Sequence, residues 1–159
     1  MVKMEIKGLL MDPVSNMPVV ILRDADDGVF LPIWVGIFEA NAIAIEMEKV
    51  STPRPMTHDL LRNVLKELDT QVVRVVINEL KDNTFFARIH LSRAGATWTV
   101  DSRPSDAIAL ALRCQSEIFV EEEVLEKSKT LRADGDPDPE RLKKWLEEVN
   151  PEDLGKYRM

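Results

Sequence analysis

Short alternating or β-branched hydrophobic runs, separated by turn residues, cover most of the first 120 positions of the chain. Such runs predict strands, and the turn sequences Asp82-Asn83 and Ala94-Gly95 predict that neighbouring strands form hairpins. We expect an α+β fold, in which a mainly antiparallel mixed sheet packs with two or three core helices. The expected strands are residues 2–11, 19–22, 29–34, 71–80, 84–91, 96–100 and 117–120.

Three other stretches have the periodicity of helices. Residues 36–50 are apolar on a wide face, and a helix expected after Thr57 carries an apolar stripe at positions 60, 61, 64, 65 and 68. The stretch 107–112 is apolar nearly all round, which indicates a buried helix. Pro104 marks the first turn of that helix, because proline fits there and favours an extended conformation at Arg103 before it.

Two of these helices begin with similar polar segments, Arg54-Pro-Met-Thr-His-Asp59 and Arg103-Pro-Ser-Asp106. Hydroxyl and acidic side chains stabilise the free N–H groups of a first turn, and the same terminus can hold an external anion. For either segment alone, capping of a core helix is the simpler interpretation. The presence of two favours a site, in which both segments converge on one surface depression within a subunit or across an interface.

The chain changes character beyond Val120. Residues 133–139 have the composition of a linker or surface loop, and Asp138-Pro139 then begins a helix with an apolar stripe at positions 142, 145, 146 and 149. A lone helix of this length is marginal in water, so the stripe should dock on the core or on another subunit. We therefore expect a core domain over residues 1–131 and a linker with a C-terminal amphipathic helix over 132–159, the latter dispensable for chemistry.

The charge balance restricts what the chain can bind. The formal net charge is −7, with 13 basic against 16 acidic residues in positions 1–120 and 8 against 12 in positions 121–159. Most nucleic-acid binders carry a basic patch, because neutralising phosphates supplies much of their affinity. A nuclease with this composition would need a local basic site, bound cations, or both.

The compartment follows from three absences in the sequence. No apolar run is long enough to span a bilayer, and the first residues lack the pattern of a signal peptide. A single cysteine, Cys114, rules out an internal disulfide and suits a reducing environment. We therefore expect a cytoplasmic protein without membrane contact, in which Cys114 serves packing.

A series of short motifs runs in order through residues 1–120. The motifs are Asn-Met-Pro-Val-Val-Ile-Leu at 16–22, Leu-Pro-Ile-Trp-Val-Gly at 31–36 followed by Glu39-Ala40, Arg-Pro-Met-Thr-His-Asp-Leu at 54–60, Lys-Asp-Asn-Thr-Phe-Phe at 81–86, and Asp-Ser-Arg-Pro-Ser-Asp-Ala-Ile-Ala at 101–109. In these motifs the chain resembles the bifunctional nuclease (BFN) domain family. The resemblance implies cleavage of both DNA and RNA and assembly into oligomers.

Phosphodiester hydrolysis needs an activated water and positive charge at the phosphate, which carboxylate-held metal ions supply in many nucleases. The candidate catalytic residues, all near helix starts or strand ends, are His58, Asp59, Asp101 and Asp106. The candidate ligands of a divalent metal such as Mg²⁺ or Mn²⁺ are Glu39, Asp59 and Asp106. The candidate phosphate-binding residues are Arg54, Arg103 and Ser105.

Each candidate also has a structural interpretation. An acid in a first turn stabilises its helix, His58 can simply face solvent, and Arg54 and Arg103 can each tie a loop to a neighbouring carboxylate. His90 lies two residues after Arg88 on one face of an expected strand, which we interpret as structural or interfacial. The pattern of zinc-binding Cys and His residues is missing from the sequence.

These observations predict a cytoplasmic, homo-oligomeric nuclease that hydrolyses DNA and RNA with little sequence preference, assisted by a divalent metal. The alternative is a non-catalytic oligomeric regulatory or binding module whose two Arg-Pro helix starts hold a phosphorylated ligand or an acidic group of a partner. A third option is an oligomeric scaffold without a small ligand. The charge balance favours the alternatives, whereas the resemblance favours the enzyme.

Overall fold

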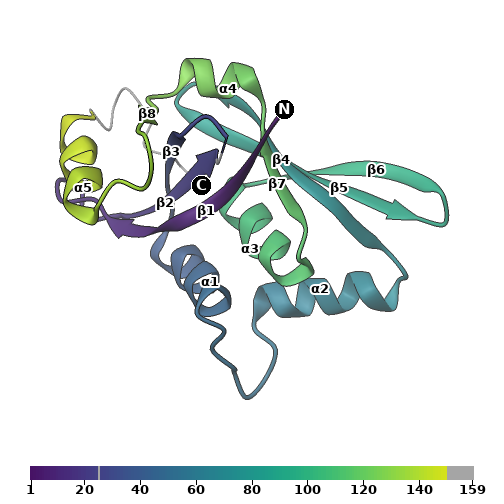
Figure 1. The fold of residues 1–159 in the computed structure, drawn as a ribbon. Coiled ribbons are helices and arrows are strands. Elements are labelled where there is room, and N and C mark those ends of the chain that lie inside the picture. Colours follow the sequence, from purple (N-terminus) through teal and green to yellow (C-terminus); the bar gives the residue numbers. More distant parts are fainter. Residues whose placement is uncertain (25, 150–159) are drawn as a thin grey trace.

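The computed structural model describes residues 1–24 and 26–149, which form one mixed eight-stranded sheet with five helices (Figure 1). The strand order is β6-β5-β4-β7-β1-β2-β3-β8, and every neighbouring pair is antiparallel except β4 and β7. The predicted α+β class is therefore confirmed. The strands are β1 (Val2–Met11), β2 (Pro18–Asp24), β3 (Val29–Trp34), β4 (Gln71–Lys81), β5 (Thr84–Arg93), β6 (Ala96–Ser102), β7 (Glu117–Val120) and β8 (Leu131–Arg132).

The hairpins form where the turn residues predict them. Asp82 and Asn83 have φ values of 50° and 60°, and Ala94 and Gly95 have 48° and 85°. Positive φ at both central residues gives a two-residue turn whose twist matches that of the flanking strands. The resulting β5–β6 hairpin extends beyond the helices in Figure 1.

The helices are α1 (Ile37–Met47), α2 (Thr57–Glu67), α3 (Pro104–Cys114), α4 (Glu122–Lys127) and α5 (Pro139–Glu148). Helix α3 is buried on nearly every side, as its composition predicts, because it packs against β4, β5 and β7 and is flanked by α1 and α2. Arg103 precedes it in an extended conformation (φ −69°, ψ 144°). Helix α4 and strand β8 were not predicted, since each is too short for a clear periodic signal.

The C-terminal helix belongs to the same core as the sheet. The four residues of its predicted stripe, Leu142, Trp145, Leu146 and Val149, are all buried in the central hydrophobic cluster. Asp138 caps the helix by accepting a hydrogen bond from the Arg141 amide at 2.8 Å. The predicted boundary at 131/132 falls inside β8, which pairs with β3, so it does not mark a break in packing.

The exposed apolar surface lies on α2 and on the edge strand β6. Strand β3 is buried along its whole length and pairs with β2 on one side and, at Val29 and Phe30, with β8 on the other. By contrast, no residue of α2 is fully buried. Of its predicted apolar stripe, Leu65 packs against the core, whereas Leu60, Leu61, Val64 and Leu68 are exposed. The edge strand β6 is exposed over Ala96–Asp101 and includes Trp98 and Val100. In the described part of the chain, no helix is long and apolar enough to cross a membrane.

Candidate active site

Four segments meet at one surface depression of about 800 Å³. Helix α1 contributes Glu39, the first turn of α2 contributes His58, and the end of β6 contributes Asp101. Arg103 and Asp106 come from the start of α3. Because α3 is fixed in the core, its polar first turn holds a defined position at the base of the depression.

Asp106 is the centre of a hydrogen-bonded network. Its Oδ1 lies 2.9 Å from His58 Nε2, and its Oδ2 accepts a hydrogen bond from Arg103 Nε at 2.9 Å. Arg103 Nη1 donates to Glu39 Oε1 at 3.0 Å. The His58 side chain is only 12% exposed, whereas that of Arg103 is 43% exposed. The network thus runs from a largely buried imidazole to a guanidinium that solvent can reach.

The network fixes the charge of Asp106. The hydrogen bond with His58 lowers the pKa of Asp106, and Arg103 lowers it further, although partial burial acts in the opposite direction. Asp106 is therefore ionised at neutral pH and accepts hydrogen bonds from both partners. A neutral His58 must then carry its proton on Nε2, which leaves Nδ1 as an acceptor.

The start of α1 is shaped to place Glu39. Gly36 precedes the helix, and a Cβ at this position would collide with the Glu39 carboxylate. The missing side chain therefore allows Glu39 to turn back across the helix start toward Arg103. Beside it, Phe38 is 84% exposed at the edge of the depression, whose walls also include Met56, Leu61 and Val100. The site combines polar groups at its base with apolar walls.

Arg113 was not predicted, yet it anchors the helix that carries His58. Its side chain is fully buried, and its Nε donates to Asp59 Oδ1 at 2.7 Å. Its Nη1 and Nη2 donate to the carbonyl oxygens of Ala109 and Ala42 at 2.9 and 3.0 Å. Arg113 therefore joins α1, α2 and α3. The sequence signal was a single arginine directly after an apolar run, which requires a buried partner.

Asp59 has a structural role in this arrangement. Its second oxygen accepts a hydrogen bond from the Met56 amide at 2.9 Å, which caps α2. Burial raises the pKa of Asp59, but the Met56 and Arg113 hydrogen bonds outweigh it, so the pKa is lowered. The N-cap residue is Met56, and Thr57, which was predicted as the N-cap, is the first helical residue, so α2 begins one position earlier than predicted.

The predicted convergence of six residues is therefore only partly right. His58, Arg103 and Asp106 meet in the depression, whereas Arg54 and Asp59 line a separate hollow of about 330 Å³. Ser105 is fully buried, which corrects its assignment as a phosphate-binding residue. Its side chain points into the core because residue 105 lies on the buried face of α3.

The three predicted metal ligands do not form one set of donors. Glu39 and Asp106 are bridged by the guanidinium of Arg103, and Asp59 is bound to Arg113. Over residues 1–24 and 26–149, no group of three or more His, Cys, Asp or Glu side chains is placed to hold a metal ion. The arrangement does not fit a metal on these residues, and we assign no chemical step to one.

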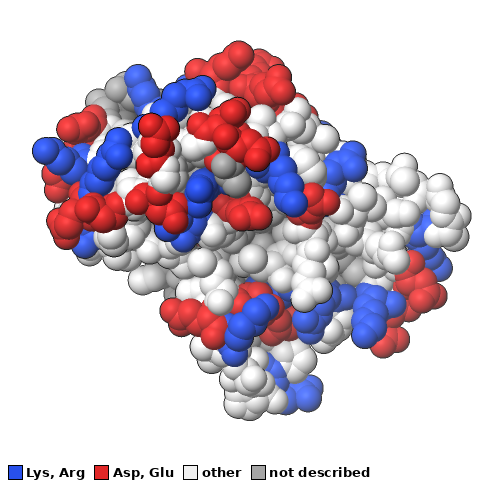
Figure 2. Space-filling model, in the orientation of Figure 1, with Lys and Arg blue, Asp and Glu red and all other residues white. Residues whose placement is uncertain are grey.

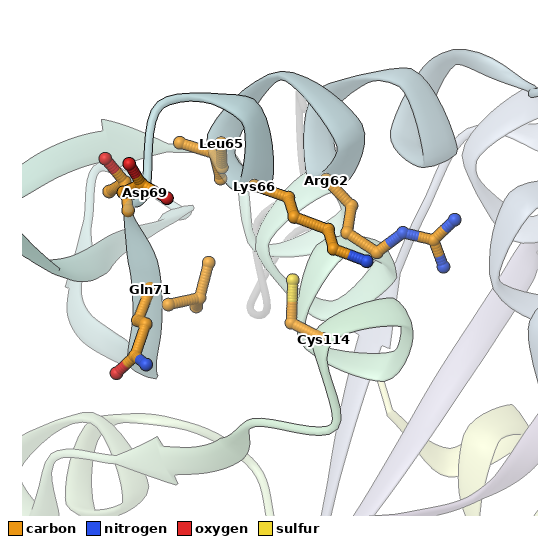
Figure 3. A pocket seen from close by; sticks show the side chains of 8 residues that line it. Arg62, Leu65, Lys66, Asp69, Gln71 and Cys114 are labelled. Atoms are coloured by element: carbon orange, nitrogen blue, oxygen red, sulfur yellow. The ribbon is translucent and has the colours of Figure 1, made fainter.

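Another hollow, of about 570 Å³, lies between α2 and the start of β4 (Figure 3). Arg62 and Lys66 extend over it, and Cys114 lies at its wall. Burial raises the pKa of the Cys114 thiol, although Arg62 has a smaller opposite influence. Cys114 is therefore a poor nucleophile, in accordance with the expectation that it serves packing.

The surface does not show one dominant charge. On the face drawn in Figure 2, acidic and basic side chains are interspersed, and the region of the β5–β6 hairpin is largely uncharged. The depression is lined by three carboxylates (Glu39, Asp101 and Asp106) and by the single guanidinium of Arg103. Its formal charge is therefore −2 when His58 is neutral. Any phosphate in this site must be held by specific hydrogen-bond donors, because the net negative charge of the depression does not attract an anion.

An α+β domain with a hydrogen-bonded His–Asp pair in an open depression is suited to acid–base chemistry on a large substrate. The bifunctional nuclease domain matches residues 20–132, which include every residue of this network. The chain belongs to this family.

The relatives differ in how much of each protein is shared. An uncharacterized protein of Mycobacterium tuberculosis is 36% identical over 96% of this chain and 97% of its own length. Bifunctional nuclease 1 of Arabidopsis thaliana is 28% identical over 71% of this chain and 36% of the plant protein. Bifunctional nuclease 1 of Oryza sativa subsp. japonica is 25% identical over 70% of this chain and 34% of the plant protein. The domain is thus about a third of the plant proteins.

Proposed function

We propose that the protein is a nuclease that hydrolyses phosphodiester bonds of DNA and RNA with little sequence preference. The observation that carries the proposal is the 2.9 Å contact between His58 Nε2 and Asp106 Oδ1 inside an open depression. Membership of the bifunctional nuclease domain family supports the reaction class.

His58 acts as the general base. Asp106 accepts the Nε2 proton, fixes the tautomer and stabilises the imidazolium that forms during the reaction. Among the described residues, His58 Nδ1 has no hydrogen-bond partner, so it can accept a proton from an attacking water. As the water oxygen bonds to phosphorus, the P–O bond to the leaving oxygen breaks, and that oxygen takes up a proton from solvent. A water nucleophile makes no distinction between DNA and RNA.

Arg103 binds the phosphate. Its Nε and Nη1 are held by Asp106 and Glu39, which orient the guanidinium, whereas Nη2 has no partner within the described ranges. Nη2 can therefore donate to a phosphate oxygen and stabilise the charge that develops there. The apolar walls offer stacking surfaces more than hydrogen bonds to base edges, which is why we propose little sequence preference.

Assembly of several copies is part of the proposal. The apolar stripe of α2 (Leu60, Leu61, Val64 and Leu68) is exposed, and Leu61 also lines the depression. A second copy packed on this stripe would remove it from water and narrow the entrance to the site. The same exposed surface favours the second candidate function, a non-catalytic oligomeric regulatory or binding module.

The test compares purified wild type with His58→Ala, Asp106→Asn and the control Glu147→Gln, which makes the same acid-to-amide type of change on the exposed face of α5. Labelled single-stranded DNA and RNA are incubated with Mg²⁺, with Mn²⁺ and with a chelator. We expect His58→Ala to lower kcat about 10²–10⁴-fold, the usual contribution of a general base, and Glu147→Gln to retain wild-type activity.

Two outcomes would contradict the proposal. Cleavage at equal rates by wild type and by both site variants would place the activity in another site or in a contaminant. Binding without cleavage by wild type under all metal conditions would favour the regulatory or binding module. Cleavage that stops in the chelator would require a metal site other than the donor set of Glu39, Asp59 and Asp106 as they are arranged here.

A further inference from the structure

One face of the β4–β5 pair carries basic side chains that the active site does not use. Arg74 on β4 lies directly opposite His90 on β5, and Arg88 precedes His90 by two residues, so the three project from the same face. We call these three residues the basic sheet face. The opposite face of the same strands, with Val75, Ile77, Ala87, Ile89 and Leu91, is buried on the side of α3.

The charges of the basic sheet face are not compensated by ion pairs. In the described part of the chain, neither Arg74 nor Arg88 has a carboxylate within 4.0 Å, although Glu117 and Asp101 lie opposite them in register. Glu117 is bound instead to Lys3 at 3.2 Å. Like charges on neighbouring strands destabilise a sheet, so an anion at this position would stabilise the fold.

The hydrogen-bonding groups of the basic sheet face are also unsatisfied. Arg74 Nε is buried and has no partner among the described residues. Arg88 donates from Nη1 only to the hydroxyl of Thr99, at 3.3 Å, and Thr99 lies opposite His90 on β6. Two guanidinium groups, an imidazole and a hydroxyl thus offer donors in one place, a set that matches the oxygens of a phosphate.

The pKa of His90 depends on the charges that surround it on the basic sheet face. Partial burial is the largest influence, followed by Arg74 and Arg88, and together they lower the pKa of His90. The groups that face it are Arg74 from β4, Arg88 from β5, Asp101 from β6 and Glu117 from β7. The two cations outweigh the two carboxylates at the imidazole, and a bound phosphate would reverse this balance.

We propose that the basic sheet face binds a phosphate group of the nucleic-acid backbone outside the site of cleavage. Asp101 connects the two regions, since it lies opposite Arg88 in register and also lines the depression that contains His58 and Arg103. The depression lies on the α3 side of the sheet, where Ile89 and Val100 line it, so a nucleic-acid strand bound there would reach the basic sheet face by passing around the edge strand β6. The proposal rests on the proposed nuclease function, and it supplies a local basic surface of the kind that a nucleic-acid-binding chain of net charge −7 requires.

The first test uses the wild-type protein alone. The chain has only two histidines, His58 and His90, so their imidazole C–H signals can be followed separately by NMR during a pH titration. Inorganic phosphate, a short DNA oligonucleotide and chloride are compared at equal ionic strength. Because a bound anion favours the charged imidazolium, we expect the pKa of His90 to rise with phosphate and with the oligonucleotide relative to chloride.

The second test measures the salt dependence of binding with a labelled single-stranded oligonucleotide. Arg74→Gln/Arg88→Gln should weaken binding at low salt at least tenfold and reduce the slope of log K against log salt by about 0.7, since each neutralised phosphate on a single strand contributes about 0.7 and this face holds one phosphate. The matched control is Arg93→Gln on the same strand, because Arg93 lies at the hairpin end and, by strand alternation, on the opposite face from Arg88. This control should keep the wild-type slope.

Each outcome separates the two proposals. An unchanged His90 titration together with an unchanged salt slope overturns the phosphate site, even if the protein cleaves nucleic acid. A rise with inorganic phosphate but an unchanged slope assigns the face to a free phosphorylated molecule and overturns the backbone contact. A changed slope in a protein without cleavage supports the basic sheet face and contradicts the nuclease function alone.

Discussion

Replacing Arg113 with methionine tests how the three helices around the site are held together. Methionine keeps much of the length of the side chain but removes all three hydrogen bonds, to Asp59, Ala109 and Ala42. The Asp59 side chain is only 17% exposed, so its carboxylate would lose its hydrogen-bonded partner and keep only the weaker influence of Arg62 nearby. Breaking a buried pair in this way costs about 3–5 kcal/mol.

That loss is a large part of the stability of a domain of this size, which is about 5–15 kcal/mol. With a shift of about 2–4 °C for each kcal/mol, we expect the Tm of Arg113→Met to fall by roughly 6–20 °C. Circular dichroism at pH 7 measures the melting, and Arg113→Lys, which keeps the charge but not the three-way contact, should fall between wild type and Arg113→Met. Nuclease activity should fall as well, because α2 carries His58.

A loss of stability below about 1 kcal/mol in Arg113→Met would contradict this prediction, because the triple contact would then contribute no more than an exposed ion pair. A double-mutant cycle gives a second criterion. Asp59→Leu combined with Arg113→Met removes both charges, so the double variant should be more stable than the sum of the single losses implies, by about 1–3 kcal/mol. Strict additivity would show that the two side chains are not coupled.

Three further predictions concern Arg103, Asp12 and Val64. Arg103→Ala should lower the free energy of unfolding by less than about 1 kcal/mol, because the ion pairs of Arg103 are partly exposed. The same change should reduce oligonucleotide affinity about tenfold or more. A large fall in Tm with unchanged affinity would show that Arg103 has a structural role only. Asp12 accepts a hydrogen bond from Trp34 Nε1 at 2.7 Å, and although burial raises its pKa, this bond and others from Val14 and Ser15 lower it overall. The pKa of Asp12 is thus lower in the folded than in the unfolded state, so its stabilisation is present above about pH 4 and is lost as the pH falls through the folded-state pKa. Urea unfolding at pH 7, 5 and 3 should show that the free energy of unfolding of Asp12→Asn depends less on pH than that of wild type. Parallel pH dependences of the two proteins would contradict this prediction. Val64→Lys on the exposed stripe of α2 should shift light-scattering mass toward the monomer, whereas a wild-type monomer at micromolar concentration would refute assembly through this face.

The sequence determined the elements because their signals are local. Alternation and turn residues placed the β4–β5 and β5–β6 hairpins, since positive φ at Asn83 and Gly95 depends on a few neighbouring residues. Pro104 placed the start of α3, and Asp138 with Pro139 placed the start of α5, through the same local rules of capping. The motifs also indicate the bifunctional nuclease domain family, because they are short local runs of sequence.

Only the tertiary structure decided which polar residues meet. His58 and Asp106 are 48 positions apart, and Arg103 and Glu39 are 64 apart, so no spacing in the chain could pair them. The two Arg-Pro segments look alike, yet the packing of α3 buries Ser105 and turns Asp59 toward Arg113, away from the depression. Helix α2 has a strong apolar stripe that a local rule assigns to the core, but α3 already fills the interior, so only Leu65 packs against the core and the rest of the stripe is exposed. Periodicity shows that a helix has an apolar face, whereas the competition of all elements for one core decides where that face points.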